Sequence, residues 1–276
     1  MADAQIILGD RGLREDDLTL IQEAEAIILP QSCSPGLYKA CTNSSARIFP
    51  DYRLRFKYPG KIGQTALFER LKWPHPVTTI WTSVAQFAGG YTVAKAFPHK
   101  IPFLMKANEG HEGEGIYFIP DRDALNSCLE NLLALENKGA PGFISQEFIK
   151  NGGNVLRTVI IGSTIITYWK RSEAPGQMIT TISQGARIDK SWKTELQKKG
   201  REITEKISAT TGINLAAFDF IFPPSQTVPQ PLLLEINYYF GRRGLGGSIQ
   251  FYHLLYDAIR GWLRENGFDA GSVRLV

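Results

Sequence analysis

Hydrophobic residues along the chain gather in two kinds of pattern, which change from segment to segment. Short apolar runs bounded by turn residues predict strands at residues 77–81, 102–107, 115–119, 142–149, 154–162, 163–171, 215–222 and 231–237. Longer segments with apolar positions on one face predict helices at residues 61–72, 83–97, 121–137, 191–211 and 249–266. This mixed order, with an expected hairpin at Gly162-Ser163, predicts an α+β fold with antiparallel hairpins rather than a doubly wound parallel sheet.

Punctuation by proline and glycine divides the chain into three expected parts. Residues 1–60 are predicted to form a small lobe, with strands at residues 5–8 and 26–29 around one helix. The segment Trp73-Pro74-His75-Pro76 ends the helix at 61–72, because proline lacks an N–H group and restricts the residue before it. We therefore expect lobes at residues 1–60, 61–145 and 146–276.

Composition narrows the class of protein without identifying it. Of the 276 residues, 43% are apolar and 21% are charged, as in ordinary soluble globular proteins. No apolar run approaches the roughly 20 residues that span a bilayer, and the first residues lack the features of a signal peptide. We expect a cytoplasmic protein without a membrane partner. The net charge of +4 supports nucleic-acid binding poorly, and Cys33, Cys41 and Cys128 are expected to be free buried thiols.

The stretch PFLMKANEGHEGEGIYFI places one lysine inside an expected strand and a glycine-rich turn just after it. Lys106 lies in the apolar run, and Gly110, Gly113 and Gly115 follow. A lysine among apolar residues must reach water or find an anion, and glycine lets backbone N–H groups approach an oxyanion. Together they predict a hairpin that covers phosphate groups, although a flexible hairpin turn is the simpler alternative. The spacing is neither that of a dinucleotide-binding fingerprint nor that of a Walker loop.

Two late strands carry oxygen-bearing side chains that could bind a metal. Glu235 and Asn237 are two residues apart, so both leave one face of their strand. Asp219 projects away from the face that carries Phe218, Phe220 and Phe222, with no basic residue near it in the sequence. If the two strands pair, these three side chains can converge on Mg²⁺, which prefers oxygen ligands. The alternative for each is a salt bridge, to Arg157, Lys170 or Arg171.

Arg157 and Arg171 are cations within otherwise apolar strands. Singly, each would be assigned to a structural or surface ion pair. Together with a metal site, they favour a polyphosphate ligand.

The order of these motifs resembles the ATP-grasp fold. Lys106-x-x-Glu109-Gly110-x-x-Gly113-x-Gly115 is followed by QEFI, RTVIIG, WKR, FDF and LEIN. The chain is most similar to RimK-type glutamate ligases and glutathione synthetases over residues 61–250, and GKIGQTALFERLKWPHPVT is similar to their helix before the nucleotide domain. The resemblance implies two α+β lobes enclosing a nucleotide, here with a short N-terminal α/β lobe.

The resemblance also implies a role for each matched residue. Phosphates would be bound by Lys106, by Lys61 and by the loop of Gly110, Gly113 and Gly115. The adenine would lie along Gln146, Glu147, Phe148 and Ile149. Arg171 and Arg157 would act near the transferring phosphate, and Asp219, Glu235 and Asn237 would hold Mg²⁺, with two ions expected. Arg242 and Arg243, in the glycine-rich loop GRRGLGG, are candidates for holding a carboxylate substrate, with a basic surface turn as the alternative.

The implied activity is an ATP- and Mg²⁺-dependent carboxylate–amine ligase that acts through an acylphosphate on small-molecule acids and amines. Three positions depart from the family pattern: Val155 replaces an acidic residue, Thr181 an asparagine and Phe240 a proline. They leave two alternatives open, an ATP-grasp kinase of small molecules and a nucleotide-binding module without catalysis. The oligomeric state is open, with a homo-oligomer among the options.

Overall fold

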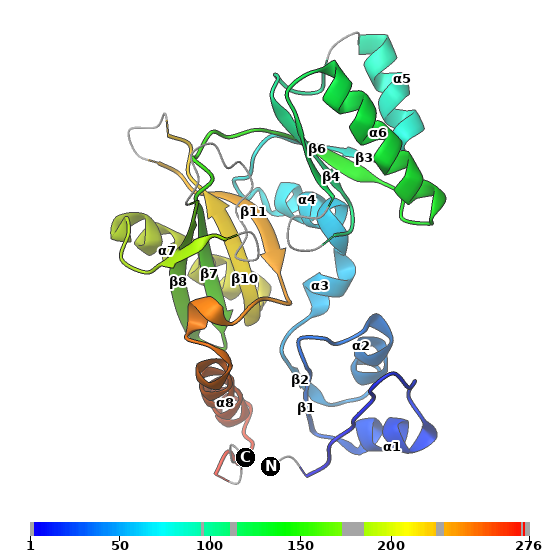
Figure 1. Cartoon of the computed structure of the whole chain (residues 1–276). Helices are drawn as coiled ribbons and strands as arrows, with labels where there is room; N and C mark the ends of the chain where they lie inside the picture. Colours follow the sequence, from blue (N-terminus) through cyan, green and yellow to red (C-terminus); the bar gives the residue numbers. More distant parts are fainter. Residues whose placement is uncertain are drawn as a thin grey trace.

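The computed structural model describes residues 3–94, 97–110, 115–172, 185–224, 229–271 and 273, and its strands form three sheets (Figure 1). The N-terminal part holds a two-stranded sheet with three helices. Its elements are α1 (Glu15–Glu23), β1 (Ala26–Ile28), α2 (Pro35–Thr42), β2 (Arg47–Phe49) and α3 (Arg53–Lys57). Strands β1 and β2 are parallel, and α2 starts at Ser34, whose hydroxyl accepts from Leu37 N–H before Pro35 in the first turn.

Two expectations for this lobe are wrong: the strand at residues 5–8 and the single helix. Residues 5–8 form no strand: Ile7 is 73% exposed, and only Ile6 packs against the core. An isolated apolar run needs a hydrogen-bonding neighbour to become a strand, and β1 pairs with β2 instead. The short strand β2 and the additional helices were not predicted, because three-residue strands carry almost no periodic signal.

The four-stranded sheet has the order β3-β6-β4-β5 and is antiparallel throughout. It comprises β3 (Thr78–Trp81), β4 (Phe103–Ala107), β5 (Ile116–Ile119) and β6 (Phe143–Glu147). Helices α5 (Val84–Ala94) and α6 (Arg122–Asn137) lie against it (Figure 1). Asp121 caps α6 by accepting from Ala124 N–H at 2.9 Å. Strand β6 crosses the expected lobe boundary at residue 146.

The five-stranded sheet has the order β11-β10-β7-β8-β9 and is also antiparallel. Its strands are β7 (Val155–Ile161), β8 (Thr164–Arg171), β9 (Arg187–Asp189), β10 (Leu215–Ile221) and β11 (Leu232–Asn237). The predicted hairpin is confirmed as β7–β8, with Gly162 in a left-handed conformation at φ 61°. The two late strands do pair, as β10–β11, which is the condition that the metal-site hypothesis required.

Three helices position these sheets. Helix α7 (Thr194–Thr211) packs on one face of the five-stranded sheet, and α8 (Ser248–Glu265) lies on the other after the short turn η1 (Arg243–Leu245). Helix α4 (Gly60–Leu71) contacts β3, β6 and β11, so it joins the two larger sheets (Figure 1). The predicted helix at 61–72 therefore lies between the two expected ATP-grasp lobes.

The face of the five-stranded sheet under α8 changes from apolar to charged residues along its strands. Beneath α8 the inward positions are apolar and buried, among them Val159, Leu215 and Ala217. Two residues further along the same strands, the positions on this face are Arg157 and Asp219. Because residues i and i+2 of a strand share a face, the helix covers the apolar rows, and the charged row begins beyond it.

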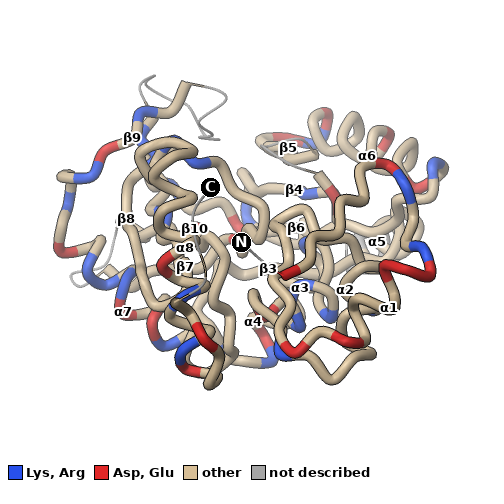
Figure 2. Tube along the Cα trace, turned by 90° about the horizontal axis from the view of Figure 1, so that it is seen from below, with Lys and Arg blue, Asp and Glu red and all other residues tan. Residues whose placement is uncertain are grey.

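Around the outer helices, both charge signs are interspersed. Figure 2 shows both Lys or Arg and Asp or Glu positions around α7. None of the helices in the described part of the chain is both long enough and apolar enough to cross a membrane. Cys33, Cys41 and Cys128 are free and buried, as expected.

Candidate functional site

Four charged or polar side chains from neighbouring strands meet at the end of the apolar face. Asp219 on β10 is paired in register with Glu235 on β11 and with Arg157 on β7. Directly opposed residues of antiparallel strands project to one face. Lys170, two residues after Tyr168 on β8, reaches the same group, because Tyr168 is paired with Arg157.

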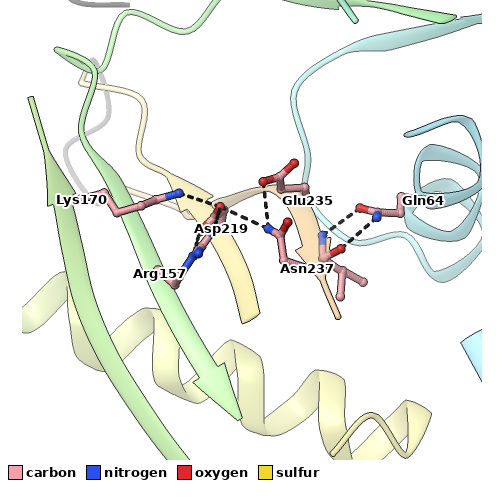
Figure 3. Close-up of polar contacts among 7 residues, drawn as sticks. Gln64, Arg157, Lys170, Asp219, Glu235 and Asn237 are labelled. Carbon is pink, nitrogen blue, oxygen red and sulfur yellow. Dashed lines mark hydrogen bonds and ion pairs between the residues drawn. The ribbon is translucent and has the colours of Figure 1, made fainter. Parts of the chain in front are cut away.

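Asp219 is the centre of this group and is 2% exposed. Its carboxylate accepts from Arg157 through Nε at 2.8 Å and Nη2 at 2.7 Å, and from Lys170 Nζ at 2.8 Å (Figure 3). Burial alone would raise the pKa of Asp219, but the charges of Arg157 and Lys170 outweigh it and hold that pKa well below its usual range. The salt-bridge alternative is therefore present at Asp219, and its oxygens are fully engaged by cations.

Lys170 is a site residue that sequence reasoning considered only as a salt-bridge partner. It is 6% exposed, and burial lowers its pKa while Asp219 opposes that shift. Arg171, expected in the cleft, projects from the opposite face of β8: its Nη1 donates to Asp189 at 2.9 Å, and its guanidinium lies over the Trp192 ring. A step of one residue along a strand reverses the face, so Arg171 lies on the face opposite Lys170 and outside the group around Asp219, and its expected role near the transferring phosphate stays a prediction.

Glu235 and Asn237 extend the group on the edge strand β11. Asn237 Nδ2 donates to Glu235 Oε1 at 2.8 Å and more weakly to Asp219 Oδ2 at 3.4 Å (Figure 3). No contact within the described residues engages Glu235 Oε2 or Asn237 Oδ1. These oxygens suit Mg²⁺, which is commonly held by one or two carboxylates together with water and substrate phosphates. Asp219 could join them only by sharing an oxygen that already accepts from a cation.

The four-stranded sheet contributes the opposing cation. Lys106 on β4 is 8% exposed, and its Nζ donates to Gln146 Oε1 on β6 at 2.7 Å. Gln146 Nε2 in turn donates to Thr78 Oγ1 at 2.9 Å. Burial lowers the pKa of Lys106 to about 8, with the nearby charge of Glu235 acting in the opposite direction and that of Lys61 adding to it.

One cavity joins the two sheets. It is lined from the four-stranded side by Thr78, Lys106, Ile144 and Gln146, from α4 by Lys61, Gln64, Thr65 and Phe68, and otherwise by His75, Leu234 and Glu235. The expectation that early cations and late carboxylates face a common cleft is thus met for Lys61, Lys106 and Glu235. The cavity volume is about 10 Å³, the room of one water-sized sphere.

The described start of the glycine loop, at Gly110, lies beside the first turn of α4. Gly110 and Gly115 have φ angles of 142° and 68°, while Gly113 and Thr181 lie outside the described residues. Lys61 Nζ approaches Gly110 O at 3.5 Å, and Lys61 N–H donates to Asn108 O at 3.0 Å. The structure therefore ties the first turn of α4 to the beginning of the loop.

The expected adenine segment is only partly a strand. Strand β6 ends at Glu147, whose Oε1 accepts from Val77 N–H at 2.8 Å. Phe148 packs edge-on against Phe118 with ring centroids 5.2 Å apart, and Ile149 follows outside the strand. The Glu147 side chain thus binds the backbone of the residue directly before β3.

Arg242 and Arg243 border an open hollow of about 390 Å³ after β11. Gln31 and Tyr239 line it as well, together with Phe240, Gly241, Gly247 and Ser248. Arg242 lies over the rings of Phe251 and Tyr252, and Arg243 is exposed. Among the described residues, neither arginine forms an ion pair with a carboxylate.

Gly244 sets the position of this arginine-bearing loop. A Cβ at Gly244 would lie 2.0 Å from Tyr168 Cζ, and the Tyr168 ring is fully buried beside Arg157. We expect Gly244→Ala to destabilise the protein by about 1–3 kcal/mol through overpacking, measured by urea unfolding. Gly241→Ala is the matched control, because nothing lies within 4 Å of its added Cβ. Equal stability of the two variants would show that the contact with Tyr168 does not restrain the loop.

Comparisons with known proteins agree with this arrangement. The model of the RimK-like ATP-grasp domain matches residues 65–249. The chain is 26% identical over 148 residues to a probable alpha-L-glutamate ligase 1 of Shewanella amazonensis, covering 53% of this chain and 46% of that protein. It is 29% identical over 147 residues to a probable alpha-L-glutamate ligase of Xanthomonas oryzae, with the same coverage. The chain thus spans about half the length of these relatives.

Solved structures show the same fold at low sequence identity. A RimK domain ATP-grasp protein from Sphaerobacter thermophilus has a TM-score of 0.55 at 14% identity, over 91% of this chain and 97% of that one. The VanG D-Ala:D-Ser ligase from Enterococcus faecalis has a TM-score of 0.59 at 17% identity, over 81% and 67%. The α+β class and the ATP-grasp fold expected from the motifs are confirmed, and the family match extends over most of the chain. This chain belongs to the RimK-like ATP-grasp family.

Proposed function

We propose that this protein is an ATP- and Mg²⁺-dependent carboxylate–amine ligase. The observation that carries the proposal is the single cavity lined by Lys61 and Lys106 on one side and by Glu235 on the other. Asn237 and Asp219 lie next to Glu235. Cations facing a cluster of oxygen donors suit a magnesium-bound polyphosphate.

Different side chains would hold the phosphates, the adenine and the Mg²⁺ ion. Lys106, Lys61 and the loop containing Gly110 and Gly115 would contact phosphate oxygens. The adenine would lie along the four residues Gln146, Glu147, Phe148 and Ile149. Mg²⁺, one ion or two, would be held by Glu235 and Asn237 with Asp219, and when bound it would neutralise charge on the phosphates.

The two cations beside Asp219 have different expected roles. Lys170 would turn toward the transferring phosphate in place of Arg171, because Lys170 lies on the face with Glu235. Arg157, bound to both oxygens of Asp219, would keep that carboxylate in position.

The proposed reaction makes a poor acyl donor reactive. A substrate carboxylate oxygen attacks the γ-phosphorus of ATP, the bond to the bridging oxygen breaks, and ADP leaves. The amine nitrogen then attacks the carbonyl carbon of the acylphosphate, phosphate departs with the electron pair, and the amine loses a proton. The chain would position these groups and exclude water that would hydrolyse the acylphosphate.

The substrates are proposed by class. The named relatives are probable alpha-L-glutamate ligases, so we propose an amino acid or peptide-type substrate. Arg242 and Arg243, without carboxylate partners among the described residues, would hold its carboxylate in the hollow after β11. Use of ATP fits a cytoplasmic protein.

Measurement of ADP release with pooled amino acids tests the proposal. ADP release that depends on an added amine, with a new amide in the product, is the expected result. ADP release without an amine, accompanied by a phosphorylated product, would instead identify a kinase. Nucleotide binding without turnover would identify a module that lacks catalysis.

Nucleotide affinity is expected to depend on the charge of Lys106. Its pKa of about 8 means that the free protein loses this charge as the pH rises through 8. Phosphate oxygens favour the charged form, so binding should take up a proton above pH 8 and the affinity should fall by up to tenfold per pH unit there. Calorimetry in buffers of different ionisation enthalpy measures this uptake.

Two substitutions sharpen this test. Lys106→Ala should weaken ATP binding about 10- to 100-fold at pH 7, because a charge-assisted hydrogen bond is lost. Lys106→Arg keeps its charge and should flatten the dependence above pH 8. Unchanged affinity in Lys106→Ala would exclude the phosphate contact.

A further inference from the structure

Strand β11 lies at the edge of the five-stranded sheet, and its outer side is paired by segments from elsewhere in the chain. Leu233 N–H donates to Pro74 O at 2.8 Å. Three residues further on, both backbone groups of Ile236 meet one side chain of α4. Gln64 Nε2 donates to Ile236 O at 2.9 Å, and Ile236 N–H donates to Gln64 Oε1 at 2.8 Å (Figure 3).

The chemistry of the glutamine side chain matches this backbone site. A primary amide carries a donor and an acceptor side by side, so it can satisfy both groups of one edge residue as a neighbouring strand would. Neither a carboxylate nor an apolar side chain of the same length can do both.

The hydrogen bonds between Gln64 and Ile236 matter because of where Ile236 lies on β11. Ile236 separates Glu235 from Asn237, the two residues with oxygens left for a metal. On its other side, β11 pairs with β10 through a register shift between Asp219 and Phe220, which leaves Leu234 without an opposed residue. A bulge locally disrupts the ladder, so the backbone at Glu235 is held less firmly from the β10 side.

We propose that Gln64 is a positioning residue that holds the β11 backbone so that Glu235 and Asn237 face the cleft together. Gln64 also lies one helical turn after Lys61, and both line the cavity with Glu235. The same contact therefore sets the distance between a phosphate-binding cation and the metal-binding oxygens. This inference rests on the proposed function, because it assigns a role in binding the magnesium–nucleotide.

The experiment compares two glutamine-to-methionine variants, one at the outer edge of the five-stranded sheet and one on helix α7, which packs on a face of that sheet. Gln64→Met removes both hydrogen bonds to Ile236 at nearly constant side-chain length. Gln197→Met is the control: Gln197 is 6% exposed and donates to the carbonyls of Lys190 and Trp192 at 3.0 and 2.9 Å, on the side of α7. Each protein is measured by hydrogen exchange at the Ile236 amide and by binding of ADP with Mn²⁺ and without metal.

In Gln64→Met we expect faster exchange at Ile236 and about 10- to 100-fold weaker binding of Mn²⁺–ADP, the usual effect of losing a group that orients metal ligands. Binding of metal-free ADP should stay within about threefold of the unmodified protein, since phosphate-binding cations are retained. Gln197→Met should match the unmodified protein in all three measurements.

Two results would overturn the role of Gln64. Equal Mn²⁺–ADP affinity in Gln64→Met and the unmodified protein would show that the contact does not position the ligands. An equal loss with and without metal would show that Gln64 shapes the nucleotide pocket instead. Failure of the proposed function is distinguishable, because a loss of ligase activity alone appears in the ADP-release assay and leaves the Gln64 result unaffected, whereas an unmodified protein that bound no Mn²⁺–ADP would overturn both.

Discussion

Asp219→Asn is expected to destabilise the folded protein by about 3–5 kcal/mol. The substitution preserves the shape of the side chain but leaves Arg157 and Lys170 buried without their anion. Removing one partner of a buried ion pair costs far more than removing one from the surface, because the remaining charge has no water to solvate it. Urea unfolding at pH 7 measures the loss. Turnover should fall as well, since the cations lose their fixed position.

The matched control is Asp51→Asn, which breaks the exposed pair with Arg53 and should cost no more than about 1 kcal/mol. The sign of the pH effect follows from the lowered pKa of Asp219. Its contribution is present above the unfolded-state pKa of about 4 and is lost as the pH falls below that value. The difference between Asp219→Asn and the unmodified protein should therefore shrink in acid. A loss at pH 7 no larger than that of the control would contradict the buried cluster.

Glu235→Gln should abolish Mg²⁺-dependent turnover, with a fall of at least about 10²–10³ in kcat. The substitution removes the negative charge that attracts the metal but keeps the length of the side chain. Because Glu235 forms no salt bridge among the described residues, the free energy of unfolding should change by no more than about 0.5 kcal/mol. Steady-state ADP release and urea unfolding, measured on one preparation, separate the two effects.

Glu205→Gln, on the exposed surface of α7, is the control for this substitution and should leave both measurements unchanged. Full activity in Glu235→Gln would reject the assignment of the metal site. A large loss of stability would instead show that Glu235 is mainly structural.

Helix α4 and the segment after it are bonded to both of the larger sheets. Gln64 and Pro74 bind the outer edge of β11. Helix α4 also contacts β3 and β6, and Lys61 N–H donates to Asn108 O just after β4, so this segment connects the two sheets.

Much of the architecture follows from local sequence. The alternation in residues 154–171, with glycine at the turn, is enough to predict the β7–β8 hairpin, because the turn brings adjacent strands together. The strand predictions fail where a local pattern is not matched by a neighbouring strand or is too short to detect. Residues 5–8 look like a strand but pair with no other strand in the described part of the chain, and β2 is too short to show a period.

For the site, the sequence alone determined which side chains share a strand face, since that depends only on the two-residue repeat. It placed Glu235 with Asn237, and its motif order indicated the ATP-grasp family. Only the tertiary structure decided which face looks into the cleft, because that depends on pairing between strands distant in the chain. Asp219 meets Arg157 across 62 residues, Lys170 rather than Arg171 joins them, and Gln64 reaches Ile236 across 172. Such contacts arise from long-range register, which a local repeat cannot specify.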